Sequence, residues 1–210
     1  MFNFRKKKYK KVVAIIALAV ITTFAGARVF PKNSFKSDAQ YTYIRYVIDG
    51  DTIITRNNEK IRLIGVDTPE YHESDKLTRQ ARFKGVSIQE IQKKGKKAYK
   101  FTNKLVLGKK VLLTLDENNA YIGHRDKYGR LLAYVYILDD KIKNDYVIKK
   151  QIKIKHNSDE TMDAVFLNAT LLNAGYANAY RRYDYKHKKY FLELERKAKR
   201  NKSGLWKQGF

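Results

Sequence analysis

Residues 41–70 read YTYIRYVIDGDTIITRNNEKIRLIGVDTPE, and this stretch decides the fold. Its β-branched and aromatic residues form three short runs, at 41–48, 52–56 and 60–66, which are separated by Asp-Gly-Asp and by Asn-Asn. Runs of this composition between turn residues are typical of antiparallel strands joined by tight hairpins. The sequence therefore predicts a three-stranded meander.

After the meander the apolar pattern takes on a helical period and then returns to strands. Ser87 and Glu90 have the spacing of a capping box, and apolar residues recur at helical intervals as far as Gly108. Residues 110–115 and 131–138 read as two further strands. Five strands with a helix between the third and the fourth is the order of an OB-fold barrel, a common nucleic-acid platform.

Two more helices are expected to close the chain. Apolar residues at helical spacing run from Met162 to Leu172, with Gly175 placed to stop that helix, and the last helix covers about residues 186–202. The predicted fold class is α+β, a five-stranded OB-fold β-barrel with three helices. The folded domain occupies residues 41–210.

An insertion separates the last barrel strand from these two helices, at about residues 139–160. Residues 146–155 within it alternate apolar and basic side chains, which predicts an added hairpin. Its lysines have two interpretations. They extend a surface that binds polyanions, or they keep an exposed edge strand soluble.

The bulk composition indicates a partner with negative charge. In 210 residues, 45 Lys and Arg stand against 21 Asp and Glu, a net charge of +24. Such an excess attracts nucleic acid, anionic lipid or anionic cell-wall polymer. The absence of cysteine excludes disulfides, thiolate zinc sites and a cysteine nucleophile. The four histidines are scattered, without the spacing of metal ligands.

The first 27 residues have the three parts of a secretory signal. Residues 5–11 carry six positive charges, residues 12–27 are uncharged and mostly apolar, and Ala25-Gly26-Ala27 suits signal peptidase. We expect cleavage after Ala27. The alternative is a retained membrane anchor, although 16 residues fall short of the roughly 20 that span a bilayer. Residues 28–40 read as a linker, and the protein is expected to be secreted or tethered to the outer face of the cell membrane.

Carboxylates gather at the turns of the predicted meander. Asp49 and Asp51 lie at its first turn, while Asp67 and Glu70 follow its third strand. Adjacent antiparallel strands can bring these turns together, and crowded carboxylates require a neutralising cation. A donor set made only of oxygen suits calcium or magnesium. The alternative is two ordinary solvated turns, because Asp and Gly favour turns in any protein.

Two arginines favour a reactive site over solvated turns. Arg62 lies on the third strand, and Arg130 ends the segment Asp126-Lys127-Tyr128-Gly129-Arg130. Arginine holds a phosphate with two parallel hydrogen bonds, which lysine does not. A metal, a spare carboxylate and two arginines are the groups that phosphodiester cleavage needs.

Three segments carry a resemblance to a known family. VIDGDT at 47–52, IRLIGVDTPE at 61–70 and DKYGR at 126–130 resemble, in order and spacing, the motifs of the thermonuclease family, that of staphylococcal nuclease. The resemblance runs from Tyr41 to Trp206. It implies a calcium-dependent enzyme that cleaves DNA and RNA with little base preference and leaves 3′-phosphate ends. We expect a monomer that touches a membrane only through an uncleaved N-terminal segment.

The resemblance also implies roles for individual residues. At matched positions, calcium binds the side chains of Asp51 and Asp67 and the backbone carbonyl of Thr68, with Asp49 behind these ligands. Glu70 orients or deprotonates the attacking water, and Arg62 and Arg130 hold the phosphate. Lys127 and Tyr128 contact a terminal phosphate. The family also places two tyrosines near the base. Tyr180 and Tyr183 are the candidates here, and the register of this segment stays open between them and ordinary packed or exposed tyrosines.

Two other functional classes compete with the nuclease. One is a non-catalytic OB-fold module that only binds nucleic acid, and the other is a cationic protein directed at cell-wall polymer or anionic lipid. The presence of Arg62, Glu70 and Arg130 within their motifs favours the enzyme, because a binding module does not need them and net charge does not explain them.

Overall fold

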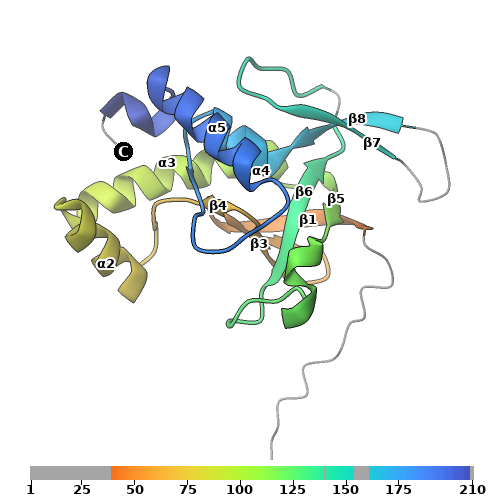
Figure 1. Cartoon of the computed structure of the whole chain (residues 1–210), viewed down its shortest axis with the longest axis horizontal. Coiled ribbons are helices and arrows are strands. Elements are labelled where there is room, and N and C mark those ends of the chain that lie inside the picture. Colours follow the sequence, from red (N-terminus) through yellow and green to blue (C-terminus); the bar gives the residue numbers. More distant parts are fainter. Residues whose placement is uncertain (1–38, 140, 154–160, 209–210) are drawn as a thin grey trace, which may run out of the picture. The chain divides into compact units, whose positions relative to one another are not determined.

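The computed structural model describes residues 39–139, 141–153 and 161–208 (Figure 1). The expected signal or anchor segment lies outside the described residues, as does most of the expected linker. The described elements are β1 (Ala39–Asp49), β2 (Thr52–Thr55), β3 (Lys60–Leu63), β4 (Val66–Asp67), α2 (Asp75–Lys84), α3 (Ile88–Val106), β5 (Lys110–Thr114), η2 (Glu117–Ile122), β6 (Leu131–Ile137), β7 (Lys149–Lys153), β8 (Thr161–Phe166), α4 (Leu167–Asn173), β9 (Asn178–Ala179), α5 (Lys188–Arg200) and η3 (Gly204–Gln208).

Five strands close into the predicted barrel. The antiparallel order β3-β2-β1-β5-β6 is completed by a parallel pairing of β3 with β6, which leaves no free edge among these five strands. Alternate residues of each strand face inward, and the apolar ones are buried, for example Ile44, Ile53, Ile61, Val111 and Val135. The OB-fold barrel expected from the meander is therefore confirmed.

The sheet continues beyond the barrel through β8 and β7. β7 lies within the predicted insertion, and its antiparallel partner β8 follows that insertion, while residues 154–160 between them lie outside the described part of the chain. Lys149, Lys150 and Lys153 on β7 are exposed at the end of the strand order. This position suits both interpretations of these lysines.

The helix expected from Met162 begins only at Leu167, so this expectation was wrong for its first turn. Val165 pairs with Ile137 and Phe166 with Tyr136, which makes these residues the end of strand β8. A short apolar run fits strand and helix equally well, and here pairing with β6 decides between them. α4, when it starts, is buried along its whole length.

The central helix α3 begins as predicted. The Ser87 side chain accepts a hydrogen bond from the Glu90 N–H at 3.1 Å. The Glu90 carboxylate, however, pairs with the Lys94 ammonium at 2.8 Å one turn later. α3 ends at Val106, close to the predicted limit at Gly108.

An additional helix, α2, precedes α3 and was not predicted. The Ser74 side chain caps it by accepting a hydrogen bond from the Leu77 N–H at 3.1 Å, and Gly85 ends it in the left-handed conformation. Leu77 and Ala81, four residues apart, pack against Ile91 of α3. This contact fixes α2 against the first turn of α3.

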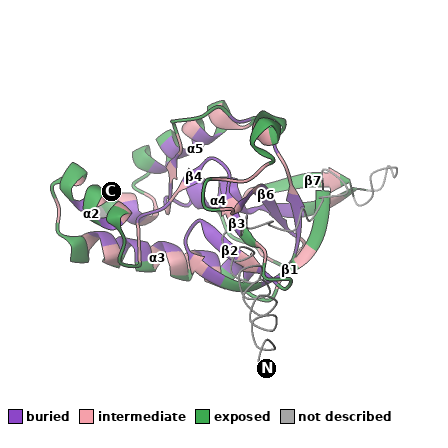
Figure 2. Cartoon of the chain, turned by 90° about the horizontal axis from the view of Figure 1, so that it is seen from below, coloured by how far each residue is buried: buried purple, intermediate pink, exposed green. Residues whose placement is uncertain are grey.

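The last helix, α5, covers the barrel together with α4. Phe191 of α5 is fully buried and contacts Tyr134 of β6 and Phe166 of β8 through ring centroids 6.3 and 5.7 Å apart. Figure 2 shows buried and exposed residues alternating along α3 and α5. In the described part of the chain, no helix combines the length and the apolar character that a membrane-spanning helix needs.

Candidate active site

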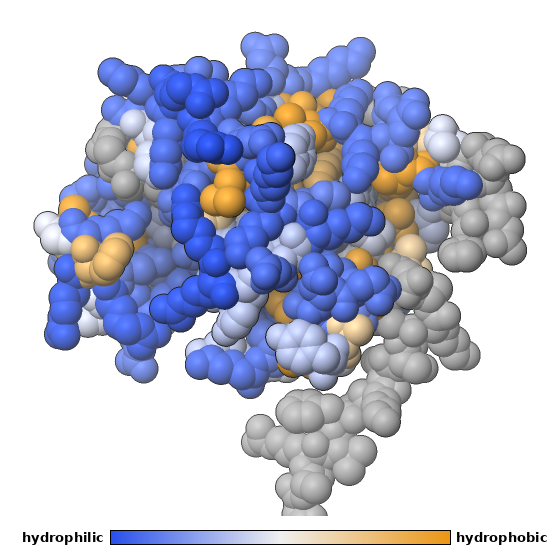
Figure 3. All heavy atoms as spheres, in the orientation of Figure 1, coloured by the Kyte–Doolittle hydropathy of each residue, from blue (hydrophilic) through white to orange (hydrophobic). Residues whose placement is uncertain are grey.

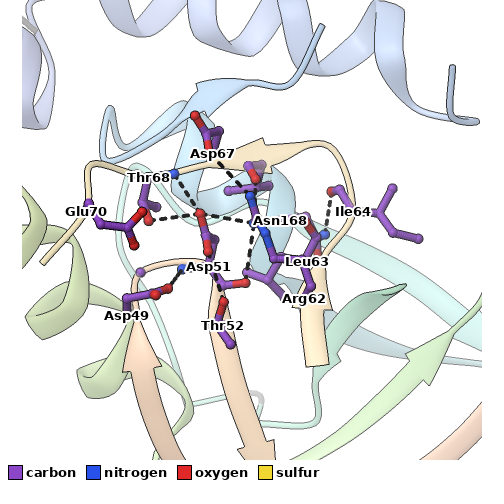
Figure 4. Close-up of polar contacts among 12 residues, drawn as sticks. Asp49, Asp51, Thr52, Arg62, Leu63, Ile64, Asp67, Thr68, Glu70 and Asn168 are labelled. Atoms are coloured by element: carbon purple, nitrogen blue, oxygen red, sulfur yellow. Dashed lines mark hydrogen bonds and ion pairs between the residues drawn. The ribbon is translucent and has the colours of Figure 1, made fainter. Parts of the chain in front are cut away.

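The carboxylate of Asp51, in the turn between β1 and β2, contacts the turn at Asp67–Glu70, which follows the third strand of the meander (Figure 4). Its Oδ2 atom accepts hydrogen bonds from the Thr68 N–H at 2.8 Å and the Thr68 hydroxyl at 3.0 Å, and it lies 3.0 Å from Nη1 of Arg62. The Arg62 guanidinium also donates to the Val66 carbonyl at 2.7 Å and contacts Asp67 at 3.3 Å. The structure thus brings together the residues that the sequence placed on two separate turns.

Barrel closure brings the second arginine to the same place. Because β3 and β6 pair in parallel, Arg130, the residue immediately before β6, lies near the strand of Arg62. Asp126 shapes the preceding turn by accepting the Arg130 N–H at 3.0 Å, and it orients the guanidinium through Nε at 2.7 Å. Nη1 of Arg130 donates to the Thr52 hydroxyl at 3.3 Å, which in turn donates to Asp51 at 3.1 Å.

A lysine that the sequence analysis missed completes the site. Lys76, in the first turn of α2, places its ammonium 3.1 Å from the Asp67 carboxylate and 3.1 Å from the Glu70 carboxylate. Gln80, one turn later on the same face of α2, accepts the Glu70 N–H at 3.0 Å. α2 therefore fixes both the side chain and the backbone of Glu70.

Helix α3 packs directly against the backbone of the site through small residues. The backbone of Glu70 passes so close to Gly95 that an added Cβ would lie 2.4 Å from the Glu70 carbonyl oxygen. Three residues later, Ala98 would lie 2.9 Å from a Cβ built on Gly50, in the turn between β1 and β2. The Thr102 hydroxyl then donates to the Gly50 carbonyl at 2.8 Å. One face of α3 thus contacts both the turn that carries Glu70 and the turn between β1 and β2, and fixes their relative positions.

The pKa values of two neighbouring carboxyls differ sharply. Burial, and then the adjacent charge of Asp51, raises the pKa of Asp49 to about 8. Burial also disfavours ionisation of Asp51, but Arg62, Lys76 and the Thr68 N–H outweigh it and hold the pKa of Asp51 well below its usual range. Asp51 is therefore the fixed negative charge at the centre of the site.

The donor set fits a hard divalent cation in charge and in kind. The carboxylates of Asp51, Asp67 and Glu70 face two cations, Arg62 and Lys76, which leaves one negative charge uncompensated. The available atoms are carboxylate and carbonyl oxygens, the ligands that calcium prefers. Within the described residues, no three acidic or histidine side chains converge as a ready-made cluster. Asp67 turns the same oxygen, Oδ1, toward both Arg62 and Lys76.

Comparison with known proteins shows the family to which the chain belongs. A family model described as staphylococcal nuclease homologue matches residues 60–208, which include β3, the Asp67–Glu70 turn and Arg130. The chain belongs to the staphylococcal nuclease family. The resemblance proposed from three short motifs is therefore confirmed over most of the chain.

Individual relatives of this family cover different shares of the chain. An uncharacterised protein of Methanocaldococcus jannaschii is 33% identical, over 91% of this chain and 92% of its own length. Thermonuclease of Staphylococcus intermedius is 34% identical, over 64% of this chain and 73% of its own. Thermonuclease of Staphylococcus hyicus is 35% identical, over 60% and 66% respectively.

The two candidate tyrosines lie beside the Asp67 turn in this member of the staphylococcal nuclease family. β9 pairs with β4 so that Asn178 faces Asp67, and the Tyr180 N–H donates to the Gly65 carbonyl at 3.0 Å. The rings of Tyr180 and Tyr183 lie 5.8 Å apart, and Tyr183 is 63% exposed. Tyr185 is instead buried against Phe191, and its hydroxyl donates to the Tyr180 carbonyl at 2.9 Å.

Lys127 and Tyr128 lie on the turn that presents Arg130. Tyr128 is 69% exposed, with the Lys127 ammonium 5.0 Å and the Arg130 guanidinium 5.4 Å from its ring centroid. The three side chains therefore form one exposed cationic and aromatic group at the rim of the site.

Two kinds of residue escaped the sequence analysis. Lys76 and Gln80 lie on a helix that was not predicted, although Ser74 before an acidic residue and Gly85 eleven residues after Ser74 were helix signals. Asn168 on α4 is fully buried; it accepts the Val135 N–H at 3.0 Å and donates to the Ile64 carbonyl at 2.9 Å. No sequence signal distinguished it, because its partners lie far away along the chain.

Replacing Asp49 by asparagine is expected to stabilise the protein in EGTA. In the wild type the Asp51 N–H donates to the Asp49 carboxyl at 3.2 Å. Asparagine can still accept this hydrogen bond, but it needs no added proton to remain uncharged. The pKa of Asp49 is about 8 in the folded protein, against about 3.9 in an unfolded chain. Between these values the folded state binds more protons, so its stability falls as pH rises.

The gain in melting temperature of Asp49→Asn should therefore be small near pH 4 and reach several degrees at pH 8. Differential scanning calorimetry at both pH values measures it. An equal gain at the two pH values would show that Asp49 is not held protonated.

Proposed function

We propose that this protein is an exported, calcium-dependent nuclease that hydrolyses phosphodiester bonds in DNA and RNA and leaves 3′-phosphate ends. Its family and its thermonuclease relatives support a hydrolase acting on phosphodiesters. The observation that carries the proposal is a shared location: Arg62 contacts the buried carboxylate of Asp51, Glu70 lies beside it (Figure 4), and Arg130 is linked to it through the Thr52 hydroxyl. A module that only binds nucleic acid does not require this arrangement.

Asp51, Asp67 and the Thr68 carbonyl would hold the calcium ion. When bound, the ion supplies positive charge to a phosphate oxygen and neutralises the carboxylates around it. Asp51 is the ligand whose position is already fixed, since Thr68 donates two hydrogen bonds to it. Asp49, which accepts the Asp51 N–H, fixes the backbone of that ligand.

Glu70 is the proposed base toward water. Its carboxylate is only 13% exposed, and its backbone is fixed by Gln80, so it presents its oxygens in a defined direction. Water attacks the phosphorus atom, the bond to the 5′ oxygen breaks, and the leaving oxygen takes up a proton. The products are a 3′-phosphate and a 5′-hydroxyl.

Arg62 and Arg130 are the proposed phosphate clamp. Each guanidinium is held by a carboxylate, Arg62 by Asp51 and Arg130 by Asp126, so neither has to be ordered during the reaction. Donors fixed in advance stabilise the charge that develops on the phosphate oxygens more strongly than mobile ones. Lys127 and Tyr128 at the rim are proposed to contact a terminal phosphate, and Tyr180 and Tyr183 a base.

Secretion is proposed on the N-terminal sequence alone, with cleavage after Ala27 or retention as an anchor. A strongly basic surface suits an enzyme that meets nucleic acid at low concentration, because it raises the encounter rate. Figure 3 shows that hydrophilic residues cover most of the face in view.

Digestion assays with calcium and with EGTA test the proposed function. Residues 28–210 should cleave single- and double-stranded DNA and RNA with calcium, and excess EGTA should abolish cleavage because the proposed ligands are all oxygens. Magnesium is expected to bind without supporting turnover, since its stricter octahedral geometry displaces the water. Undiminished cleavage in EGTA would refute the metal-dependent mechanism.

A further inference from the structure

The register of the meander places a second row of side chains beside the candidate active site. On the outer face of the barrel, Thr52 pairs with Arg62, both of which belong to the site. Two residues away on the same face, Ile54 pairs with Lys60 on one side and with Tyr46 on the other. An extended strand alternates its faces, so these rows are neighbours, about 7 Å apart.

A bulge in β1 turns two consecutive side chains onto this outer face. The pairing of β1 with β2 shifts between Ile44 and Tyr46, which leaves Arg45 as the extra residue. Ile44 and Val47 on either side are buried in the barrel, whereas Arg45 and Tyr46 are both exposed. A regular strand would have buried one of the two.

Exposed tyrosines on this face alternate with cations. Tyr46 is 49% exposed with the Arg45 guanidinium 4.9 Å from its ring centroid, and Tyr43 is 45% exposed with Arg56 at 6.0 Å. Lys60 adds a further exposed positive charge in the row of Tyr46. We call Tyr43, Arg45, Tyr46, Arg56 and Lys60 the β1 tyrosine face; it carries three positive charges and no negative one.

This combination matches the chemistry of an unpaired nucleic-acid strand. Aromatic rings accept the faces of bases, and the cations beside them neutralise the phosphates that link those bases. Bases within a duplex are already stacked on each other and cannot lie on tyrosine rings. An anionic polymer without bases would use only the cations.

We propose that the β1 tyrosine face is an exosite that binds the unpaired strand of a nucleic-acid substrate next to the cleavage site. The proposal rests on the proposed nuclease function and adds to it a surface that holds the unpaired strand beside the cleavage site. A strand that occupies the Arg62 row continues along the same face onto Tyr46 and then Tyr43.

The test compares the double variant Tyr43→Ala/Tyr46→Ala with the wild-type full-length mature chain, residues 28–210. Binding of a labelled single-stranded 12-mer is measured by fluorescence anisotropy in EGTA, so that binding is independent of cleavage. The variant should bind at least about ten-fold more weakly, because each stacked base contributes about 1–3 kcal/mol. The double variant Tyr43→Phe/Tyr46→Phe, which keeps the rings, should bind like the wild type.

Tyr121→Ala provides a matched control. Tyr121 on η2 is 80% exposed and lies outside this face, so its loss should leave binding unchanged. Polyphosphate, which has no bases, should bind the alanine double variant as tightly as the wild type. Equal losses for polyphosphate and the oligonucleotide would overturn the proposal, as would wild-type binding by the alanine double variant.

Cleavage separates this proposal from the proposed function. With calcium, the alanine double variant should cleave a dinucleotide at the wild-type rate, since that substrate is too short to reach the exosite, and its preference for single-stranded over duplex DNA should fall. A wild-type protein that cleaves nothing contradicts the proposed function. A double variant that keeps its full preference for single strands contradicts the exosite alone.

Discussion

Replacing Arg62 by lysine should lower kcat by about 100- to 1,000-fold while the variant remains folded. Lysine keeps the positive charge but has one ammonium in place of the planar fork. The fork now contacts Asp51, the Val66 carbonyl and Asp67 together, and a single ammonium cannot reach all three. A displaced charge binds substrate in the ground state but no longer meets the charge that develops in the transition state.

The measurement separates kcat from binding. Initial rates on a dinucleotide in calcium give kcat and KM, and anisotropy with an oligonucleotide in EGTA gives affinity. We expect the affinity to change far less than kcat, and Arg130→Lys to behave in the same way, because its Nε and Nη1 atoms are also held by two separate partners.

Arg125→Lys is the matched control for Arg62→Lys. Arg125 forms a two-pronged ion pair with Glu59, at 2.8 and 3.0 Å, and its Nη1 also donates to the Gly129 carbonyl at 2.8 Å; none of these partners belongs to the carboxylate cluster. Its replacement removes a fork of the same kind, so any general cost in stability should be similar while kcat stays at the wild-type value. If Arg62→Lys retained wild-type kcat and lost only affinity, Arg62 would be a binding contact and no transition-state clamp.

The barrel could be predicted because its signals are local. Asp-Gly-Asp and Asn-Asn at the turns, with β-branched runs between them, determine the meander without help from the rest of the chain. The start of α4 could not be predicted, since Val165 and Phe166 join a strand only through β6, whose residues are far away in sequence. Helix α2 had caps at both ends, but its sparse apolar pattern hid it: only Leu77 and Ala81 are buried.

The candidate site was predicted for residues that carry their chemistry in their side chains. Asp51, Arg62 and Glu70 could be found because carboxylates and arginines within short motifs indicate phosphate chemistry. Lys76 gave no such signal in a chain with 45 Lys and Arg. Its contacts depend on where α2 packs, and that position is a tertiary property.

Gly95 shows how a residue without a side chain can belong to the site. In sequence it is an anomaly, since glycine in a helix interior costs about 1 kcal/mol relative to alanine. In the structure this cost has a reason, because the Glu70 carbonyl oxygen and carbon would lie 2.4 and 2.6 Å from any added Cβ. Both atoms belong to backbone, which cannot rotate away as the end of a side chain would.

Gly95→Ala should therefore reverse the usual effect of alanine in a helix. The added methyl must displace either α3 or the backbone of residues 70–71, and overpacking of this kind costs about 1–3 kcal/mol, or several degrees in melting temperature. A small displacement of Glu70 would misalign the water that it is proposed to orient, so kcat should fall by about 10- to 100-fold. KM should change little, because Arg62 and Arg130 do not contact Gly95.

Lys96→Ala, at the exposed neighbouring position of α3, is the control for this substitution. This substitution also introduces alanine into the same helical turn, but the alanine side chain faces solvent and not a neighbouring backbone. We therefore expect unchanged kcat and an unchanged melting temperature. Steady-state kinetics on a dinucleotide and thermal unfolding of both variants complete the comparison. A Gly95→Ala protein with wild-type kcat and a higher melting temperature would mean that the two backbones separate without cost. In that case α3 does not position Glu70, and α2, through Gln80 and Lys76, fixes it alone.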